Sequence, residues 1–255
     1  RIGGVPEHFN LPWHLAIEAG AFQEQGVSVE WHDYPGGTGA MMNALAEGEL
    51  DIAIALTEGI AAKIIQGYDL QILQNYVTSP LTWGVFVAAD ASFDQPQDLK
   101  DQTFAISRMG SGSHLMAYVY AQQHNWELSE NQLHIASSLE GMANALSQHE
   151  ADVLLWERFT AKPYAESGQI QLFDKTTPPW PAFAMVTRRE LVERSPDDLA
   201  SIQQVINTYN QQLMHDKQAI NKLTNRYAMA PTDAEEWFGQ TYWATDTTVR
   251  RQDLT

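Results

Sequence analysis

One phrase of this sequence occurs twice. The first copy reads "MMNALAEGELDIAIA" over residues 41–55, and the second reads "MANALSQHEADVLLW" over residues 142–156. At a spacing of 101 positions, Asn43-Ala44-Leu45 aligns with Asn144-Ala145-Leu146, Glu49 with Glu150, and Asp51 with Asp152. Each copy is a short Ala- and Leu-containing segment followed by a polar turn and an apolar run, which is typical of a helix leading into a buried strand. The repeat therefore favours a fold built from two similar halves.

Short apolar strands and amphipathic helices alternate around both copies. The expected strands cover residues 2–5, 27–34, 52–56, 70–77, 84–89, 103–107, 132–136, 153–156, 170–173 and 182–187. The expected helices cover residues 11–25, 40–47, 59–66, 96–99, 114–124, 140–148 and 197–227, followed by a last helix that Thr232 or Asp233 can cap. Such alternation predicts an α/β fold with parallel sheets and helices on both faces.

The two runs of this alternation predict two α/β lobes. The segments "TSPL" and "PWPAF" suit crossovers between the lobes, and the helical C-terminal part is expected to return and cover the first lobe. The predicted domains are residues 1–84 with 186–255 for lobe 1 and residues 85–185 for lobe 2. The alternative is one continuous doubly wound sheet with a chance repeat, because helix-then-strand phrases converge easily.

Composition narrows the classes of function. The net charge of −17 argues against a nucleic-acid partner, since there is no basic stripe to displace counterions from phosphates. The absence of cysteine excludes thiol catalysis, disulfides and cysteine-based metal sites. The longest apolar runs are far shorter than the roughly 20 residues that a membrane-spanning helix needs.

The beginning of the chain bears on its location. The sequence starts at Arg1 rather than at Met, and no signal peptide is visible. Such a start is weak evidence about export, because the numbering can begin after a processed leader. We expect a periplasmic location, with the cytoplasm as the alternative.

Two glycine-rich turns lead from strands into helices. "PGGTGAMM" contains Gly37, Thr38 and Gly39, and "SRMGSGSH" contains Ser111, Gly112 and Ser113. Backbone N–H groups at such a junction favour an anion or a polar ligand, and ligands of open α/β sheets bind at the carboxyl ends of the strands. The alternatives are a tight turn for the first segment and a flexible loop with a capping serine for the second.

The segment "PEHFNLPWH" follows the first strand and is stiffened by two prolines. Asn10 and Trp13 are candidate ligand contacts, and Trp13 is equally consistent with packing into the core. His8 and His14 could serve as metal ligands or as bases, although surface or internally satisfied histidines are the commoner case.

Polar residues also end the matching strands of the two copies. Thr57 and Glu58 follow the first, and Glu157 with Arg158 ends the second. The alternatives are an acid in the first turn of a helix for Glu58 and a surface ion pair for Glu157. Trp180, set among three prolines, is a further candidate contact for a planar ligand, with plain packing as the alternative. No nucleophile–base pattern of a known catalytic motif is present.

The N-terminal half resembles a known family. "GGVPEHFNLPWHLAIEAGAFQEQGVSVEW" and "GGTGAMMNALAEGELDIAIALTEG" are similar to the solute-binding proteins of nitrate, sulfonate, taurine and thiamine-pyrimidine ABC importers, which have the type II periplasmic-binding fold. The similarity is dense over residues 3–67 and looser through "DLKDQTFAISRMGSGSH". The resemblance implies two Rossmann-like lobes joined by two crossover strands, with the ligand held between them. It places the ligand contacts at Asn10, Trp13, Gly37, Thr38, Gly39, Thr57, Glu58, Ser111, Gly112, Ser113 and Glu157.

The resemblance also implies a function. We expect a monomeric, non-enzymatic protein that captures a small polar, anionic or heteroaromatic molecule by hinge closure and delivers it to an ABC permease, without cofactor or metal. "EHFNLPWH" departs from the usual loop, being richer in histidine and more acidic, and a glutamate repels anions but accepts hydrogen bonds from aminopyrimidines. The alternatives are an enzyme of thiamine-pyrimidine metabolism that uses His8 or His14, and a cytoplasmic solute sensor. A fungal branch of that kind uses cysteines, which this chain lacks.

Overall fold

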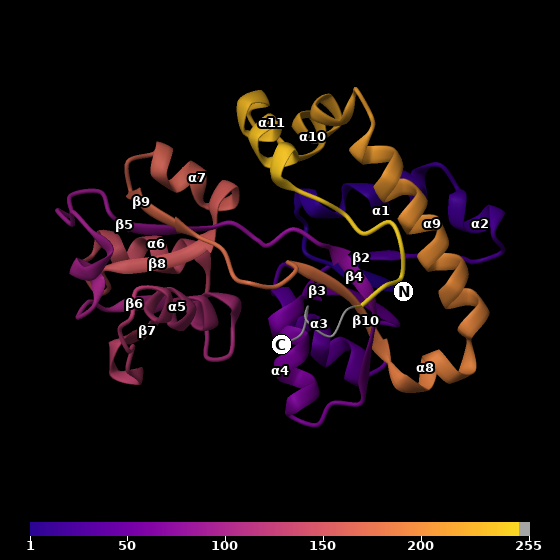
Figure 1. Ribbon diagram of the computed structural model, residues 1–255, viewed down its shortest axis with the longest axis horizontal. Helices are drawn as coiled ribbons and strands as arrows, with labels where there is room; N and C mark the ends of the chain where they lie inside the picture. The colour runs from indigo at the N-terminus through magenta and orange to yellow at the C-terminus, as the bar shows by residue number, and fades with distance from the viewer. Residues whose placement is uncertain (250–255) are drawn as a thin grey trace. The chain divides into compact units, whose positions relative to one another are not determined.

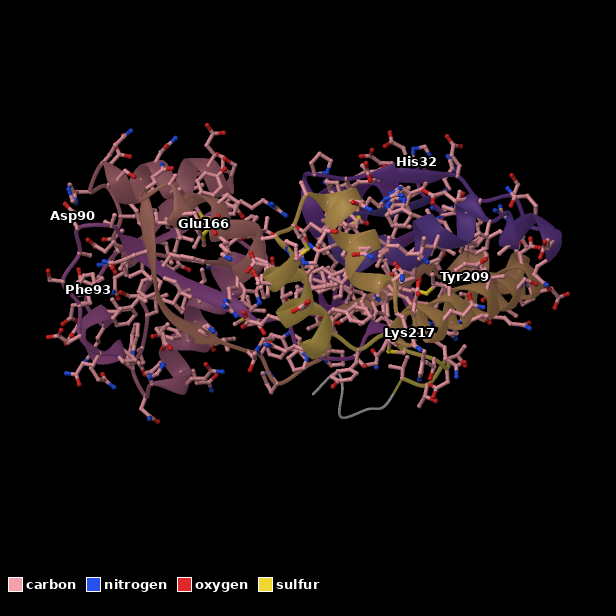
Figure 2. The ribbon with its side chains drawn as sticks, turned by 90° about the horizontal axis from the view of Figure 1, so that it is seen from above. His32, Asp90, Phe93, Glu166, Tyr209 and Lys217 are labelled. Atoms are coloured by element: carbon pink, nitrogen blue, oxygen red, sulfur yellow. The ribbon has the colours of Figure 1, made fainter. Side chains whose placement is uncertain are left out.

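The computed structural model describes residues 1–249, which form two compact units (Figure 1). Unit 1 contains Arg1–Pro80 together with the described residues from Trp180 onward, and unit 2 contains Leu81–Pro179. His32, Tyr209 and Lys217 mark unit 1 in Figure 2, and Asp90, Phe93 and Glu166 mark unit 2. The chain passes from unit 1 to unit 2 once and returns once, so unit 1 is discontinuous.

Unit 1 contains a five-stranded sheet in the order β2-β1-β3-β10-β4. Its strands are β1 (Ile2–Gly4), β2 (Trp31–Asp33), β3 (Ile52–Leu56), β4 (Leu70–Val77) and β10 (Phe183–Arg188). β1 pairs in parallel with β2 and β3, whereas β10 is antiparallel to both of its neighbours.

Unit 2 has the same arrangement, with the order β7-β6-β8-β5-β9. Its strands are β5 (Trp83–Ala88), β6 (Phe104–Ile106), β7 (Leu133–Ile135), β8 (Val153–Glu157) and β9 (Ile170–Thr176). Here β5 is the antiparallel strand between β8 and β9. The structure thus contains two separate sheets rather than one continuous sheet, as the repeat predicts.

The prediction of parallel sheets is wrong for one strand in each unit. β5 and β10 are the first strands that the chain forms after each passage between the units, and each enters its new sheet in the reverse direction. The predicted domain divisions at 84/85 and 185/186 lie inside these strands. The passages themselves occur before the strands, near Pro80 and Trp180.

Eleven α-helices are described within residues 1–249. They are α1 (Leu11–Glu18), α2 (Ala21–Glu24), α3 (Gly37–Ala46), α4 (Thr57–Ile65), α5 (Gly112–Gln123), α6 (Leu139–Ser147), α7 (Arg158–Glu166), α8 (Arg189–Arg194), α9 (Pro196–Met214), α10 (Ala219–Tyr227) and α11 (Pro231–Gln240). Short 3-10 helices cover His8–Asn10, Pro96–Leu99 and Glu130–Gln132. None of the helices in residues 1–249 combines the length and apolarity that crossing a membrane requires.

The repeated phrase forms the same structure in both units. β3 and β8, and likewise α4 and α7, are offset by 101 residues. The repeated aspartates begin the strand in both copies: the Asp51 N–H donates to Arg1 O at 2.9 Å, and the Asp152 N–H donates to Thr103 O at 2.8 Å. The turn before them has a positive φ in both copies, +75° at Gly48 and +56° at His149. The phrase therefore specifies a helix, a left-handed turn and a strand.

The helical parts of the phrase supply core. Met41, Met42 and Leu45 in α3, and Met142 and Leu146 in α6, are fully buried. Burying one such side chain contributes about 1.5–3 kcal/mol relative to leaving it in water. The middle parts of α3 and α6 therefore pack against the sheets, and polar residues lie at the ends of the repeated segments.

Several predicted elements differ from the observed ones. The helix expected over 11–25 is interrupted at Gly20, which adopts φ +72°, and the strand expected over 27–34 is reduced to β2. The helix expected over 197–227 ends at Met214, because the Asp216 carboxylate accepts from the Gln218 N–H at 2.8 Å and its carbonyl from the Ala219 N–H at 3.0 Å, which starts α10. α7 was not expected from the sequence.

Candidate functional site

The carboxyl ends of β1 and β3 bring several predicted residues of unit 1 to one edge of its sheet. Asn10 lies in the loop after β1, while Thr57 and Glu58 begin α4 directly after β3. The glycine-rich turn "GGTG" supplies the first residues of α3. Parallel strands expose their carboxyl ends at the same edge, so this edge is the candidate binding surface of unit 1.

Through Thr38, the glycine-rich turn of unit 1 brings the start of α3 into close contact with α4. Gly37 adopts φ +69°, a conformation that disfavours residues with a Cβ atom. The Thr38 hydroxyl accepts a hydrogen bond from the Leu56 N–H at 3.1 Å. A Cβ atom on Gly59 would lie 2.5 Å from the Thr38 Cγ2 atom, so α4 approaches α3 as closely as a glycine allows. The Thr38 oxygen is therefore engaged in structure, and a ligand at this turn would meet backbone N–H groups.

Glu58 is an ionisable group at this edge of the sheet. Its Oε2 atom accepts a hydrogen bond from the Trp180 Nε1 at 2.9 Å. Burial raises the pKa of Glu58 to about 7, although hydrogen bonds from its own backbone and from Trp180 oppose that rise. Two of the predicted contacts, Glu58 and Trp180, thus meet across 122 positions of sequence.

Thr57, the first residue of α4, is 2% exposed. Its N–H donates to Ala182 O at 3.1 Å, but its Oγ1 has no hydrogen-bond partner within residues 1–249. A buried hydroxyl without a partner is costly, and each such group calls for an explanation such as an absent ligand or water.

Asn10 is held inside the loop that follows β1. Its Nδ2 donates to Val5 O at 2.7 Å, and its Oδ1 lacks a partner in the described part of the chain. The preceding carbonyl, Phe9 O, accepts from Tyr76 OH at 2.8 Å and from Trp243 Nε1 at 3.0 Å. The loop is thereby tied to β4 and to the C-terminal part of unit 1.

The structure places Trp13 in the core in place of the predicted ligand contact. Trp13 is fully buried and stacks on Phe22, with ring centroids 5.6 Å apart. It also lies against Trp31 and Tyr76. Pro12 lies in the first turn of α1, and the burial of Trp13 decides between the two alternatives that the sequence pattern left open.

The two histidines of the segment "PEHFNLPWH" differ in burial. His8 is buried against Phe9 and the Trp237 ring, the latter with centroids 4.3 Å apart, and burial lowers the pKa of His8 to about 3. His14 is partly buried, and burial followed by the Arg226 charge lowers its pKa. In residues 1–249, no three His, Asp or Glu side chains are grouped so that they could hold a metal ion.

In unit 2, three buried serines cluster where β6 leads into α5. Ser113 Oγ lies 3.0 Å from Ser111 Oγ and 3.3 Å from Ser107 Oγ, and it accepts from the Ser107 N–H at 3.0 Å. Two hydroxyl–hydroxyl contacts use two of the three hydroxyl protons, so one proton remains for a partner outside the cluster. Together with the Gly112 and Ser113 N–H groups at the start of α5, which have no partner inside the helix, the cluster offers hydrogen-bond donors.

Ser111 and Ser107 hold different places in this cluster. Ser111 caps α5, accepting from the His114 N–H at 3.2 Å, and Gly112 is the first residue of the helix. Ser107 was missed from the sequence. Its signal was the one applied to Thr57, a polar residue at the carboxyl end of a buried strand.

Glu157, a predicted ligand contact, caps the helix that follows β8. Its carboxylate accepts from the Phe159 N–H at 3.2 Å, and from the Thr160 N–H and Oγ1 at 2.7 Å each, which is the role of an N-cap for α7. The side chain is 5% exposed, and burial raises its pKa. Glu157 is therefore fixed by its own helix.

Comparisons with known proteins identify the architecture. The structure superposes on that of the Candida albicans CA3427 gene product, described as exhibiting the generic periplasmic binding protein structural fold, with a TM-score of 0.88 and 27% sequence identity. That superposition covers 96% of this chain and 81% of the other. This chain has the periplasmic-binding-protein fold.

Further solved structures share the periplasmic-binding-protein fold. The alkanesulfonate-binding protein SsuA from Xanthomonas axonopodis pv. citri, bound to MOPS, has a TM-score of 0.78 at 15% identity and covers 95% of this chain and 85% of its own. The periplasmic aliphatic sulphonate binding protein SsuA from Escherichia coli has a TM-score of 0.77 at 14% identity, covering 99% and 87%. At these identities the likeness is one of fold.

Sequence comparison points to the same architecture. A family model described as Ca3427-like PBP matches residues 83–176, which is most of unit 2. No curated protein sequence gives a significant match. The alkanesulfonate and aliphatic sulphonate in the names of the two SsuA proteins are ligands of those proteins.

Proposed function

We propose that this protein is a solute-binding protein that captures a small polar, anionic or heteroaromatic molecule. In this proposal the two compact units act as the lobes, and hinge closure about the two connecting segments completes the binding site. A ligand would then bias the chain toward a closed state by contacting both lobes.

One observation carries the proposal. The two units have equivalent strand orders. At the carboxyl ends of its strands, each unit also has polar groups whose hydrogen-bonding capacity is not fully used within the unit. In unit 1 these are the Glu58 carboxylate and the Thr57 hydroxyl, and in unit 2 they are the serine cluster and the first N–H groups of α5. Groups of this kind at the strand ends of open α/β sheets are where ligands bind.

The transport role and the location rest on similarity. Two proteins with this fold and a TM-score above 0.7 are named as periplasmic sulfonate-binding proteins. These names support a periplasmic location and an ABC permease as partner, and we propose in addition that the protein acts as a monomer.

The enzyme alternative depended on His8 or His14 as reacting groups. His8 lies against aromatic rings, and burial lowers its pKa to about 3, so it keeps its neutral form at ordinary pH and is poorly suited to take up a proton. The geometry therefore favours binding over turnover.

The proposal is tested by native mass spectrometry of the purified protein, followed by thermal-shift measurements with a metabolite panel. We expect a co-purified small molecule or a panel member that raises Tm, because a ligand that binds only the folded state stabilises it. If neither a co-purified ligand nor any shift is found, the solute-binding role is contradicted.

A further inference from the structure

The N-terminus of α4 already carries an anion. Helix N-termini attract negative charge, because their first N–H groups are unpaired and the helix dipole is positive there. In α4 the Glu58 carboxylate occupies this position, accepting from its own backbone N–H and from the Trp180 Nε1 at 2.9 Å. An external sulfonate or carboxylate at this helix would have to approach an existing negative charge.

The equivalent helix of unit 2 is filled in the same way. The Glu157 carboxylate lies at the start of α7, where it accepts hydrogen bonds from the Phe159 and Thr160 N–H groups. Both helices that follow the repeated strand thus supply their own anion. In both copies of the repeat, the helix N-terminus after the strand is therefore already occupied by a carboxylate and is a poor site for an external anion.

Glu58 still has acceptor capacity to spare. A carboxylate has about four acceptor positions, and the described contacts of Glu58 are its own N–H and the Trp180 indole. Beside it, the Thr57 hydroxyl is 2% exposed and lacks a partner within residues 1–249. Two neighbouring residues at the first turn of α4 therefore present unfilled hydrogen-bonding positions: the Glu58 carboxylate, which accepts when ionised, and the Thr57 hydroxyl, which can accept or donate.

We propose that Glu58 and Thr57 select a ligand by a hydrogen-bond-donating group, such as an ammonium, an amidinium or an amino group on a heteroaromatic ring, and that Glu58 disfavours anions at this edge. This inference rests on the proposed solute-binding function and narrows its ligand class. A donor group can bond to both the Glu58 carboxylate and the Thr57 hydroxyl, whereas a sulfonate can only accept from the Thr57 hydroxyl and is repelled by the Glu58 carboxylate.

Trp180 is the positioning residue of this arrangement. Its indole N–H fixes one carboxylate oxygen of Glu58 and leaves the other oxygen oriented, which lowers the conformational cost of binding. Trp180→Phe removes this bond and leaves the charge, while Glu58→Gln removes the charge and keeps an oxygen that can accept from Trp180. The two variants separate orientation from charge.

The test uses matched probe pairs in which one group is exchanged on the same skeleton. Suitable pairs are 4-aminopyrimidine with pyrimidine-4-carboxylate, benzamidine with benzoate, and ethylamine with ethanesulfonate. Each is titrated against the wild type, Glu58→Gln and Trp180→Phe by thermal shift and calorimetry. Glu47→Gln, an exposed change of the same charge at the end of α3, is the control.

We expect at least one amino or amidino member to bind the wild type more tightly than its anionic partner. Glu58→Gln should weaken that binding about tenfold or more, the size expected for a charge-assisted hydrogen bond, and Glu47→Gln should leave it unchanged. Trp180→Phe should weaken it by a smaller factor.

Two outcomes overturn the inference and are distinguishable. Tighter binding of the anionic members, unaffected by Glu58→Gln, would leave the solute-binding function standing and refute the ligand class. If no member of either class binds and no ligand co-purifies, both the ligand class and the solute-binding function are refuted.

Discussion

The Trp180 indole nitrogen lies 2.9 Å from the Glu58 carboxylate, and this bond joins the segment that re-enters unit 1 to the first turn of α4. The carboxylate is buried enough to raise the pKa of Glu58 to about 7. The bond thus holds a partly buried acid at the edge of the sheet where the ligand is proposed to bind.

Stability between pH 4.5 and pH 7 should depend on Glu58. The folded-state pKa lies above the ordinary value of 4.5, so the folded state binds the proton more tightly than the unfolded state does. The stabilising contribution is therefore complete below pH 4.5 and is lost as the pH rises through 7. Relative to Glu58→Gln, the wild type should lose on the order of 1–3 kcal/mol over this range in urea unfolding. Parallel pH profiles for the two proteins would contradict the burial of this carboxylate.

His8 should make the free energy of unfolding fall as the pH is lowered below 6.5, which is the opposite pH dependence to that of Glu58. Its folded-state pKa is lowered from 6.5 to about 3, so the contribution to stability is present above pH 6.5 and is lost as the pH falls toward 3. By pH 4 the wild type should lose on the order of 3 kcal/mol relative to His8→Phe. Urea unfolding at pH 7 and pH 4 measures this difference. His215→Phe, an exposed site at the end of α9, is the control and should retain the wild-type pH dependence.

Loss of the Glu157 cap should destabilise unit 2. Glu157→Ala leaves the Phe159 and Thr160 N–H groups without their acceptor, and we expect a loss of about 1–2 kcal/mol. Glu157→Gln keeps one accepting oxygen and should lose less. The free energy of unfolding in urea measures both, and Glu166→Ala at the exposed end of α7 should change it by less than about 0.5 kcal/mol. Equal effects of the alanine and glutamine variants would refute the capping role.

Gly59→Ala should be destabilising through Thr38. The added Cβ would lie 2.5 Å from the Thr38 Cγ2, and overpacking of this kind costs about 1–3 kcal/mol. Thr38→Ser removes the clashing methyl group and keeps the hydroxyl that accepts from the Leu56 N–H. The double variant should therefore recover part of the loss, which thermal unfolding of all four proteins in a double-mutant cycle measures. Strictly additive effects would show that the two residues do not touch.

Much of the fold follows from local sequence. β3 and β4 lie where the apolar runs predict, and α6 and β8 lie within one residue of their predicted bounds. These elements are determined by periodicity, glycine-rich turns and capping over a few neighbouring residues. The helix over 197–227 was mispredicted for a local reason too, since the Asp216 side chain starts a new helix inside an otherwise helical pattern.

The candidate site was less predictable, because residues in the same local sequence pattern make different contacts in the folded structure. Glu58 and Glu157 both stand at the junction of the repeated strand and its helix, yet Glu157 caps α7 while Glu58 meets Trp180. Trp13 and Trp180 both follow prolines, yet only Trp13 packs into the core.

By itself, the sequence determined that the protein repeats a helix–turn–strand unit and alternates strands with helices in two α/β halves. Only the tertiary structure decided the reversed direction of β5 and β10, the burial of Trp13 and the meeting of Glu58 with Trp180. The physical reason is the distance along the chain over which each interaction acts. Periodicity and turn chemistry act between neighbours, whereas strand direction and contacts between residues 122 positions apart depend on where the chain returns to a sheet that is already formed by other segments.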